Sequence, residues 1–139
     1  SYFYECMKHR ERNNVARMYN LRDHELKNII KILSLCRNKC AHDERIYTFY
    51  SREAINNHQI HSRLSIPTRR NGSYTKGKHD LFAVLIAIKL LISKSSFNTM
   101  VTEIKNAITA LSNELQVVNS NQVLDKMGFP SNWEDIKNL

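Results

Sequence analysis

The chain has few of the residues that interrupt helices. Its 139 residues include only 3 Gly and 2 Pro, which is few for a protein of strands and tight turns and ordinary for a helical one. The longest apolar run, residues 81–92, contains Lys89 and is shorter than the roughly 20 apolar residues that a membrane-spanning helix needs. No stretch is collagen-like, repetitive or of low complexity. These absences favour a helical globular protein and exclude a membrane partner.

Cysteine is also scarce, and the number of cysteines is odd. Cys6, Cys36 and Cys40 are the three in the chain, which does not suit the paired framework of a small secreted protein. The first residues are charged almost at once, unlike a secretory signal. We therefore expect reduced thiols and a cytoplasmic location.

Positive charge is present in excess, and it is unevenly divided. Residues 1–80 hold 16 Lys and Arg against 8 Asp and Glu, whereas residues 81–139 hold 5 of each kind, and all six His lie in the first part. A basic half beside a neutral half suggests a surface that binds a polyanion such as a nucleic acid. The alternative is a basic surface that only keeps the protein soluble.

The apolar pattern predicts an all-α bundle of about five helices, forming a single domain over residues 1–139. The predicted helices are residues 2–19, 23–41, 80–92, 97–118 and 120–128, followed by a last turn that begins at Ser131 or Asn132. One more helical turn is expected within 51–58. The Pro- and Gly-containing stretch 65–79 is predicted to be a loop.

Helical periodicity gives the predicted buried positions. In the first helix they are Phe3, Met7, Val15 and Met18. In the second they are Leu26, Ile29, Leu33, Cys36 and Cys40. In the long helix they are Phe97, Val101, Ile104, Ile108, Leu111, Leu115 and Val118. The helix 80–92 is apolar nearly all round and should be central, with Trp133 covering the core.

Several residues are expected to set the helix ends. Asn20 or Asp23 should cap the second helix, and Ser120 should cap the short one. Gly128 should end that short helix.

Three polar residues stand beside the apolar stripe of the second helix. On a helical wheel Arg37 lies roughly 70° from the centre of the stripe, at its edge. Asn38 and His42 are four residues apart and share another side. Arg37 and His42 point ~140° apart in an unbroken helix. A site that uses both therefore needs a helix that ends or bends before His42, or a second copy of the helix, as in a symmetric dimer.

These side chains suit the cleavage of RNA. A histidine can take or give a proton near neutral pH, and an arginine matches the oxygens of a phosphate. Such a reaction requires no metal, and the chain has no carboxylate cluster of the kind that two-metal nucleases use. By spacing alone, however, Arg37 could simply reach solvent and His42 could serve as a helix cap or dipole partner.

The stretch "CRNKCAHDERIYTF" resembles the R-x4-H signature of the HEPN superfamily, and in particular the bacterial Abi-like (abortive infection) family. The residues that match that signature are Arg37, Asn38, Cys40, Ala41, His42, Arg45, Ile46 and Tyr47. "GKHDLFAVLIAIKLL" is similar to the apolar helix that follows the signature in that family, and "MGFPSNW" resembles its ending. The resemblance spans about residue 19 to the end.

The resemblance implies an all-helical HEPN bundle that is usually dimeric. It also implies a metal-independent endoribonuclease of phage defence, with Arg37 and His42 as the critical pair and Asn38 as a polar helper. Asp43 stands where many relatives carry a second His, and an acid there could raise the pKa of His42 or repel phosphate. Relatives are commonly about twice as long, so the chain corresponds to a C-terminal half.

Two other roles stay open. The chain could be a non-catalytic module that binds RNA or protein in a defence or toxin–antitoxin system, with an antitoxin or a guide-like RNA as partner. It could also be a structural dimerisation domain.

Further cations could hold an RNA backbone, with Tyr74 stacking on a base. They are Arg45, Arg63, Arg69, Arg70, Lys76 and Lys78. The alternatives are a solvated loop and, for Arg45, an ion pair with Asp43 or Glu44. Cys36, Cys40 and His42 could be drawn as a zinc site with His58 and His61, but core thiols are favoured, so neither a metal nor a cofactor is expected.

Overall fold

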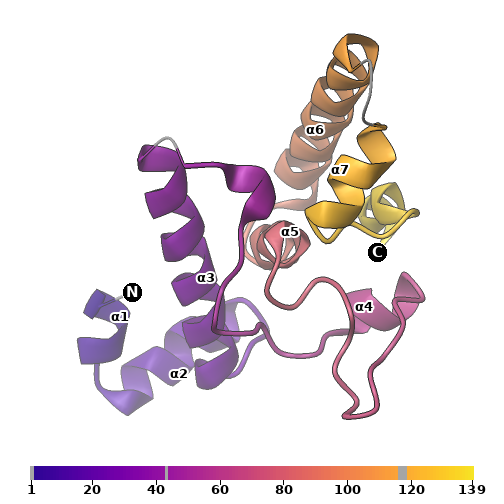
Figure 1. Ribbon diagram of the computed structural model, residues 1–139. Helices are drawn as coiled ribbons and strands as arrows, with labels where there is room; N and C mark the ends of the chain where they lie inside the picture. The colour runs from indigo at the N-terminus through magenta and orange to yellow at the C-terminus, as the bar shows by residue number, and fades with distance from the viewer. Residues whose placement is uncertain (1, 43, 116–118) are drawn as a thin grey trace.

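The computed structural model describes residues 2–42, 44–115 and 119–139, and it is all-helical, as predicted (Figure 1). The elements are α1 (Tyr2–Cys6), α2 (His9–Met18), α3 (Asp23–Ala41), η1 (Ile46–Thr48), α4 (Gln59–Arg63), α5 (Leu81–Lys89), α6 (Lys94–Glu114), α7 (Ser120–Lys126) and η2 (Trp133–Asn138). An isolated antiparallel bridge joins Thr68 to Tyr74 inside the predicted loop. None of the helices in this part of the chain is long and apolar enough to cross a membrane.

Helix α5 forms the centre of the molecule. Figure 1 shows it end-on, with α1 to α3 on one side and α6, α7 and η2 on the other. Every residue from Phe82 to Ala87 is buried, as expected for a helix that is apolar nearly all round. The Asp80 side chain begins the helix by accepting a hydrogen bond of 2.9 Å from the Ala83 N–H.

Helix α3 has the predicted bounds, but its apolar stripe leaves the core before the helix ends. Leu26, Ile29 and Ile32 are buried against α5. Cys36 is half-buried, and Cys40 is exposed. The prediction that Cys40 packs in the core is therefore wrong, because the last turns of α3 extend beyond the helices that would cover them.

The first predicted helix is two helices. Chain direction changes at Met7–Lys8, and α2 starts with the Lys8 N–H donating to the Glu11 carboxylate over 3.0 Å. The break rotates the apolar face, so Tyr4 and Ala16 are buried, while Phe3 and Met18 are exposed. Burial of Phe3 and Met18 was therefore a wrong prediction.

The turn between α2 and α3 differs from the predicted capping. Asn20 adopts a left-handed conformation with a φ of 56° and ends α2, with the Leu21 N–H bonded to the Ala16 carbonyl. The residue that precedes α3 is Arg22, whose N–H donates to the Glu25 carboxylate over 2.8 Å. Neither Asn20 nor Asp23 caps α3. The Glu25 side chain instead accepts from the backbone N–H of Arg22 at the start of the helix.

Residues 51–58 contain no helical turn, contrary to prediction. They bend at residues 52–53 and lie beside residues 78–79, with the Ser51 N–H donating to the His79 carbonyl and the Ile55 N–H to the Lys78 carbonyl. Ile55 of this segment is buried, as is Phe49 just before it. The helical turns lie instead at η1 and α4, on either side of it.

Helix α6 projects from the bundle, and α7 and η2 cover part of it (Figure 1). Its predicted stripe is buried at Phe97 and Val101, but Leu111 is exposed, and Val118 lies outside the described residues. Asn119, rather than Ser120, caps α7 by accepting from the Asn121 N–H. Gly128 ends that helix and Trp133 is buried, as predicted.

Candidate functional site

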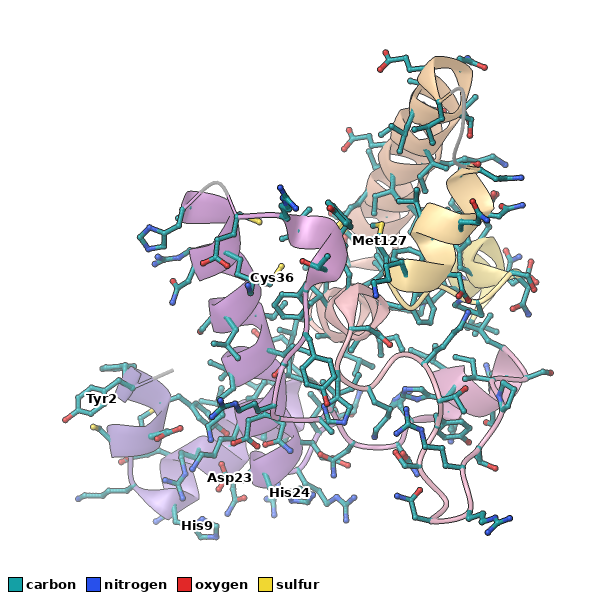
Figure 2. All side chains as sticks on the ribbon, viewed as in Figure 1. Tyr2, His9, Asp23, His24, Cys36 and Met127 are labelled. Atoms are coloured by element: carbon teal, nitrogen blue, oxygen red, sulfur yellow. The ribbon has the colours of Figure 1, made fainter. Side chains whose placement is uncertain are left out.

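The end of α3 presents the three predicted catalytic side chains to solvent. Arg37, Asn38 and His42 are all exposed, and an Arg37 guanidinium N–H donates to the Asn38 side-chain oxygen over 3.2 Å. Figure 2 shows Cys36, the preceding residue, on the face of α3 that looks toward η1. The polar side chains therefore stand beside the packed face of α3.

His42 is the residue that ends α3. Its backbone N–H donates to the Asn38 carbonyl over 3.1 Å, and its imidazole makes no hydrogen bond to any described residue. The imidazole is therefore not used as a helix cap. Helix α3 ends at Ala41, and His42 follows it with a non-helical φ of −105° and ψ of 17°. In a regular helix Arg37 and His42 would point ~140° apart.

A short ion pair lies next to these residues. The Lys39 ammonium contacts the Glu44 carboxylate at 2.5 Å, and this contact lowers the pKa of Glu44. Arg45 is exposed and forms no ion pair in the described part of the chain, so the predicted alternative pair with Glu44 is absent. Asp43 lies outside the described residues.

The predicted RNA-binding cations divide into two groups. Arg63, Arg69 and Arg70 are exposed at the surface. Lys76 is turned inward, where its ammonium contacts the Asp125 carboxylate and donates to the Phe129 carbonyl over 3.0 Å. Lys76 thus ties the loop to α7.

Lys78 does not belong to the exposed set. It is buried, and its ammonium donates to the Ile55 carbonyl and, over 2.8 Å, to the Asn57 side-chain oxygen. Burial lowers the pKa of Lys78. Lys78 therefore does not lie on the exposed surface that the predicted RNA contact would need, because its side chain is folded beneath the segment 51–58.

Tyr74 is engaged inside the fold as well. Its ring stacks on His61 with centroids 4.7 Å apart, and it is half-buried. His61 is fully buried and bonds the Gly77 carbonyl over 2.8 Å through Nε2, while Nδ1 accepts from the His58 N–H. Sequence reasoning gave His61 no role, because a lone histidine in a loop region has no periodic signal.

The cysteines show no sign of nucleophilic or metal chemistry. Burial raises the pKa of the Cys36 thiol to about 11, which disfavours the reactive thiolate. Among the described residues no group of three or more His, Cys, Asp or Glu side chains is arranged to hold a metal ion.

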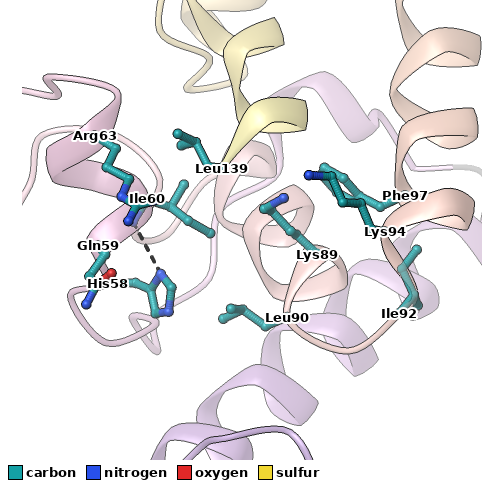
Figure 3. Close-up of a pocket in the computed structure, with 10 residues that line it drawn as sticks. All are labelled: His58, Gln59, Ile60, Arg63, Lys89, Leu90, Ile92, Lys94, Phe97 and Leu139. Carbon is teal, nitrogen blue, oxygen red and sulfur yellow. Dashed lines mark hydrogen bonds between the residues drawn. The ribbon is translucent and has the colours of Figure 1, made fainter.

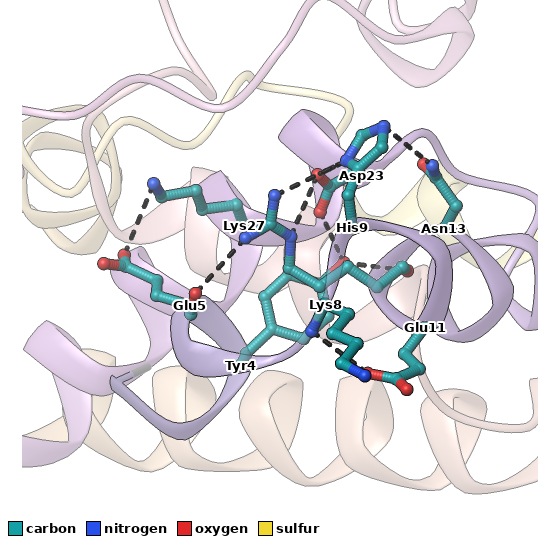
Figure 4. Close-up of polar contacts among 9 residues, drawn as sticks. Tyr4, Glu5, Lys8, His9, Glu11, Asn13, Asp23 and Lys27 are labelled. Atoms are coloured by element: carbon teal, nitrogen blue, oxygen red, sulfur yellow. Dashed lines mark hydrogen bonds and ion pairs between the residues drawn. The ribbon is translucent and has the colours of Figure 1, made fainter.

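A polar cluster joins α1 and α2 to α3 (Figure 4). The Asp23 carboxylate accepts from the Tyr4 hydroxyl over 2.9 Å and from Arg12 Nε over 3.2 Å, and His9 lies 3.4 Å away. Burial and then this carboxylate raise the pKa of Tyr4 to about 12. Lys27 of α3 also pairs with Glu5 of α1 at 3.7 Å. These contacts hold the first two helices against α3. The polar groups of the cluster have their partners within it.

Comparison with known proteins gives one match. The sequence profile of the Abi-like protein family matches residues 1–48. No curated protein and no solved structure matches the chain. The matched segment contains Arg37, Asn38 and His42 but stops before the apolar helix and the C-terminal ending, for which the resemblance stays an expectation. Residues 1–48 are therefore similar to the Abi-like protein family.

Proposed function

We propose that the protein is an endoribonuclease of an abortive-infection defence system that cuts RNA at a site shared by two copies of the chain. One observation carries the proposal. The segment that matches the Abi-like family ends in an exposed Arg37, Asn38 and His42 whose side chains bond to nothing in the described structure except each other. Polar side chains left free at an uncovered helix end suit a site that acts on something outside the fold.

The regularity of α3 supports a shared site. Since Arg37 and His42 diverge by ~140° on one helix, a single chain presents them in different directions. Two copies related by a twofold axis would place both Arg37 and both His42 side chains along one seam. Cys40 and Ala41 are exposed between them, so a second α3 can approach this end without displacing any packed element.

The chemistry follows from the residue types. One His42 takes the proton of the ribose 2′-hydroxyl, and the 2′-oxygen attacks phosphorus. The bond from phosphorus to the 5′-oxygen breaks, and the second His42 gives that oxygen a proton. Arg37 stabilises the charge on the phosphate oxygens, with Asn38 holding the guanidinium in place. The products carry 2′,3′-cyclic phosphate and 5′-hydroxyl ends.

The basic surface can bind the phosphates of the RNA strand on either side of the cleaved bond. Arg45 lies three residues beyond His42, and Arg63, Arg69 and Arg70 are exposed. Exposed arginines of this kind bind phosphates without reading sequence. Lys76 is paired with Asp125 and Lys78 is buried, so neither is included in this surface.

The main alternative is a module that binds RNA or protein without cutting it. The observation that favours it is the separation of Arg37 and His42 within one chain. A binding module predicts RNA affinity that falls with salt and survives His42→Ala, with no cleavage.

The test is incubation of a labelled RNA with the purified protein in EDTA. Wild type should produce 2′,3′-cyclic phosphate ends, and His42→Ala should be slower by about 100-fold or more, because general acid–base catalysis contributes on that scale. His24→Ala is the matched control, an exposed histidine at the other end of α3. Equal cleavage by wild type and His42→Ala would rule out the proposed site.

A further inference from the structure

A second concave site lies far from the end of α3, between α4 and the junction of α5 and α6 (Figure 3). The pocket has a volume of about 330 Å³, which is within the usual range for small-ligand sites. Arg63 and His58 stand on one side of it, and Lys89 and Lys94 stand on the other. Leu90 and Ile60 supply apolar wall.

The three cations of this pocket have no anionic partner among the described residues. Arg63, Lys89 and Lys94 form no ion pair with any acid of the described chain, and their side chains donate to no other described residue, although several surface lysines elsewhere are paired. Glu25, whose charge acts on His58, is already paired with Arg22 at 2.8 Å. Three like charges around one cavity repel each other unless an anion joins them.

The position of Lys89 is fixed by packing. Its ammonium lies 4.7 Å from the centroid of the buried Phe97 ring, a cation–π distance. Burial, and then the charge of Lys94, lowers the pKa of Lys89. A charge that is held in place and partly desolvated binds an anion more strongly than a freely moving surface lysine.

Two further donors lie at the same pocket. His58 Nδ1 accepts from the Ile60 N–H over 3.3 Å, so the neutral ring carries its proton on Nε2, which bonds to nothing else in the described structure. Lys94 is the first residue of the 21-residue helix α6, whose positive dipole end therefore lies at the pocket wall.

We propose that this pocket binds a phosphomonoester, the terminal phosphate of an RNA strand or of a free nucleotide. Cations on both walls of one pocket suit the two charges of a phosphomonoester better than the single charge of a phosphodiester. The apolar wall formed by Ile60, Leu90 and Ile92 can take the sugar or base attached to that phosphate. The proposal rests on these residues alone and does not depend on RNA cleavage at His42.

The experiment measures binding by calorimetry with four probes: inorganic phosphate, AMP, and one short RNA carrying either a 5′-phosphate or a 5′-hydroxyl. The test variant is Arg63→Gln with Lys94→Gln, two exposed residues whose replacement leaves the Phe97 contact intact. The matched control is Arg17→Gln with Lys126→Gln, which removes the same charge at exposed positions outside the pocket.

The phosphorylated probe should bind wild type and the control pair with similar affinity, and the Arg63/Lys94 variant at least tenfold more weakly. Tight binding of AMP assigns the pocket to free nucleotides, and a preference for the 5′-phosphate RNA assigns it to RNA ends. Equal binding of the two RNAs together with no binding of AMP or phosphate would overturn the proposal, as would equal losses in the test and control variants. His42→Ala should leave the binding of AMP and phosphate unchanged, which separates this pocket from the cleavage site.

Discussion

At the scale of single residues, polar side chains on a helix were predictable and those in loops were not. The exposure of Arg37, Asn38 and His42 follows from their place beside the apolar stripe of α3. The inward turn of Lys78, Tyr74 and His61 depends on contacts with residues far along the chain, such as Ile55 and Gly77. Composition and spacing do not reveal contacts between distant parts of a chain. Lys78 and Tyr74 were therefore assigned to an RNA surface, and His61 was given no structural role.

His61 makes the stability of the fold depend on pH. Burial lowers the pKa of His61 in the folded protein, whereas in the unfolded chain histidine takes up a proton near pH ~6.5. The unfolded state therefore binds more protons below that pH. The contribution of His61 is complete above about pH 6.5 and is lost as the pH falls below it.

We expect His61→Gln to lower the free energy of unfolding by about 2 kcal/mol at pH 8, through the lost packing and hydrogen bonds. Its stability should also fall less steeply than that of wild type between about pH 7 and 5.5. Urea denaturation across this range measures both effects. His24→Gln, at an exposed position, serves as the control. If the free energy of unfolding fell equally steeply with pH in wild type and His61→Gln, the account would be contradicted.

At the scale of elements, periodicity located the helices, and local hydrogen bonds decided their ends. The 23–41 helix and the buried 81–89 helix have strong apolar patterns and were predicted well. The break between α1 and α2 has neither Gly nor Pro and depends on Glu11 accepting from the Lys8 N–H. The start of α3 has the same kind of contact, in which the Glu25 carboxylate accepts from the Arg22 N–H, and neither residue expected to cap α3 does so.

Gly128 follows α7 and lies against Asp80 at the start of α5, so substitutions there test how closely the two helices approach. Its φ is 83°, and a Cβ built there would lie 2.1 Å from Asp80 Cγ, within the carboxylate that caps α5. Gly72 has a similar φ of 75° with nothing within 4 Å. Gly128→Ala should therefore lower the free energy of unfolding by about 3 kcal/mol or more, and Gly72→Ala by only about 1 kcal/mol. Thermal unfolding compares them, and equal losses would show that α7 does not close against Asp80.

At the scale of the whole molecule, the packed centre and the proposed sites lie apart. Helix α5 and its neighbours form the core, while the last turns of α3 extend past it and leave Arg37, Asn38 and His42 uncovered. The basic pocket beside α4 lies at the other end of the arrangement, between elements that the sequence did not show to be neighbours. The proposed RNA site at the end of α3 therefore needs a second copy of the chain, and the basic pocket beside α4 needs a bound anion.

The most direct test of the shared site is to mix proteins. Wild type at fixed concentration is titrated with His42→Ala under conditions that allow the copies to exchange, and RNA cleavage in EDTA is followed. If both His42 side chains are needed, a threefold excess of the variant leaves about a quarter of wild-type chains paired with wild type, so activity should fall to about a quarter. The same excess of His24→Ala should not lower it. Cleavage that stays constant as His42→Ala is added would contradict the account, because it would place a complete site within one chain.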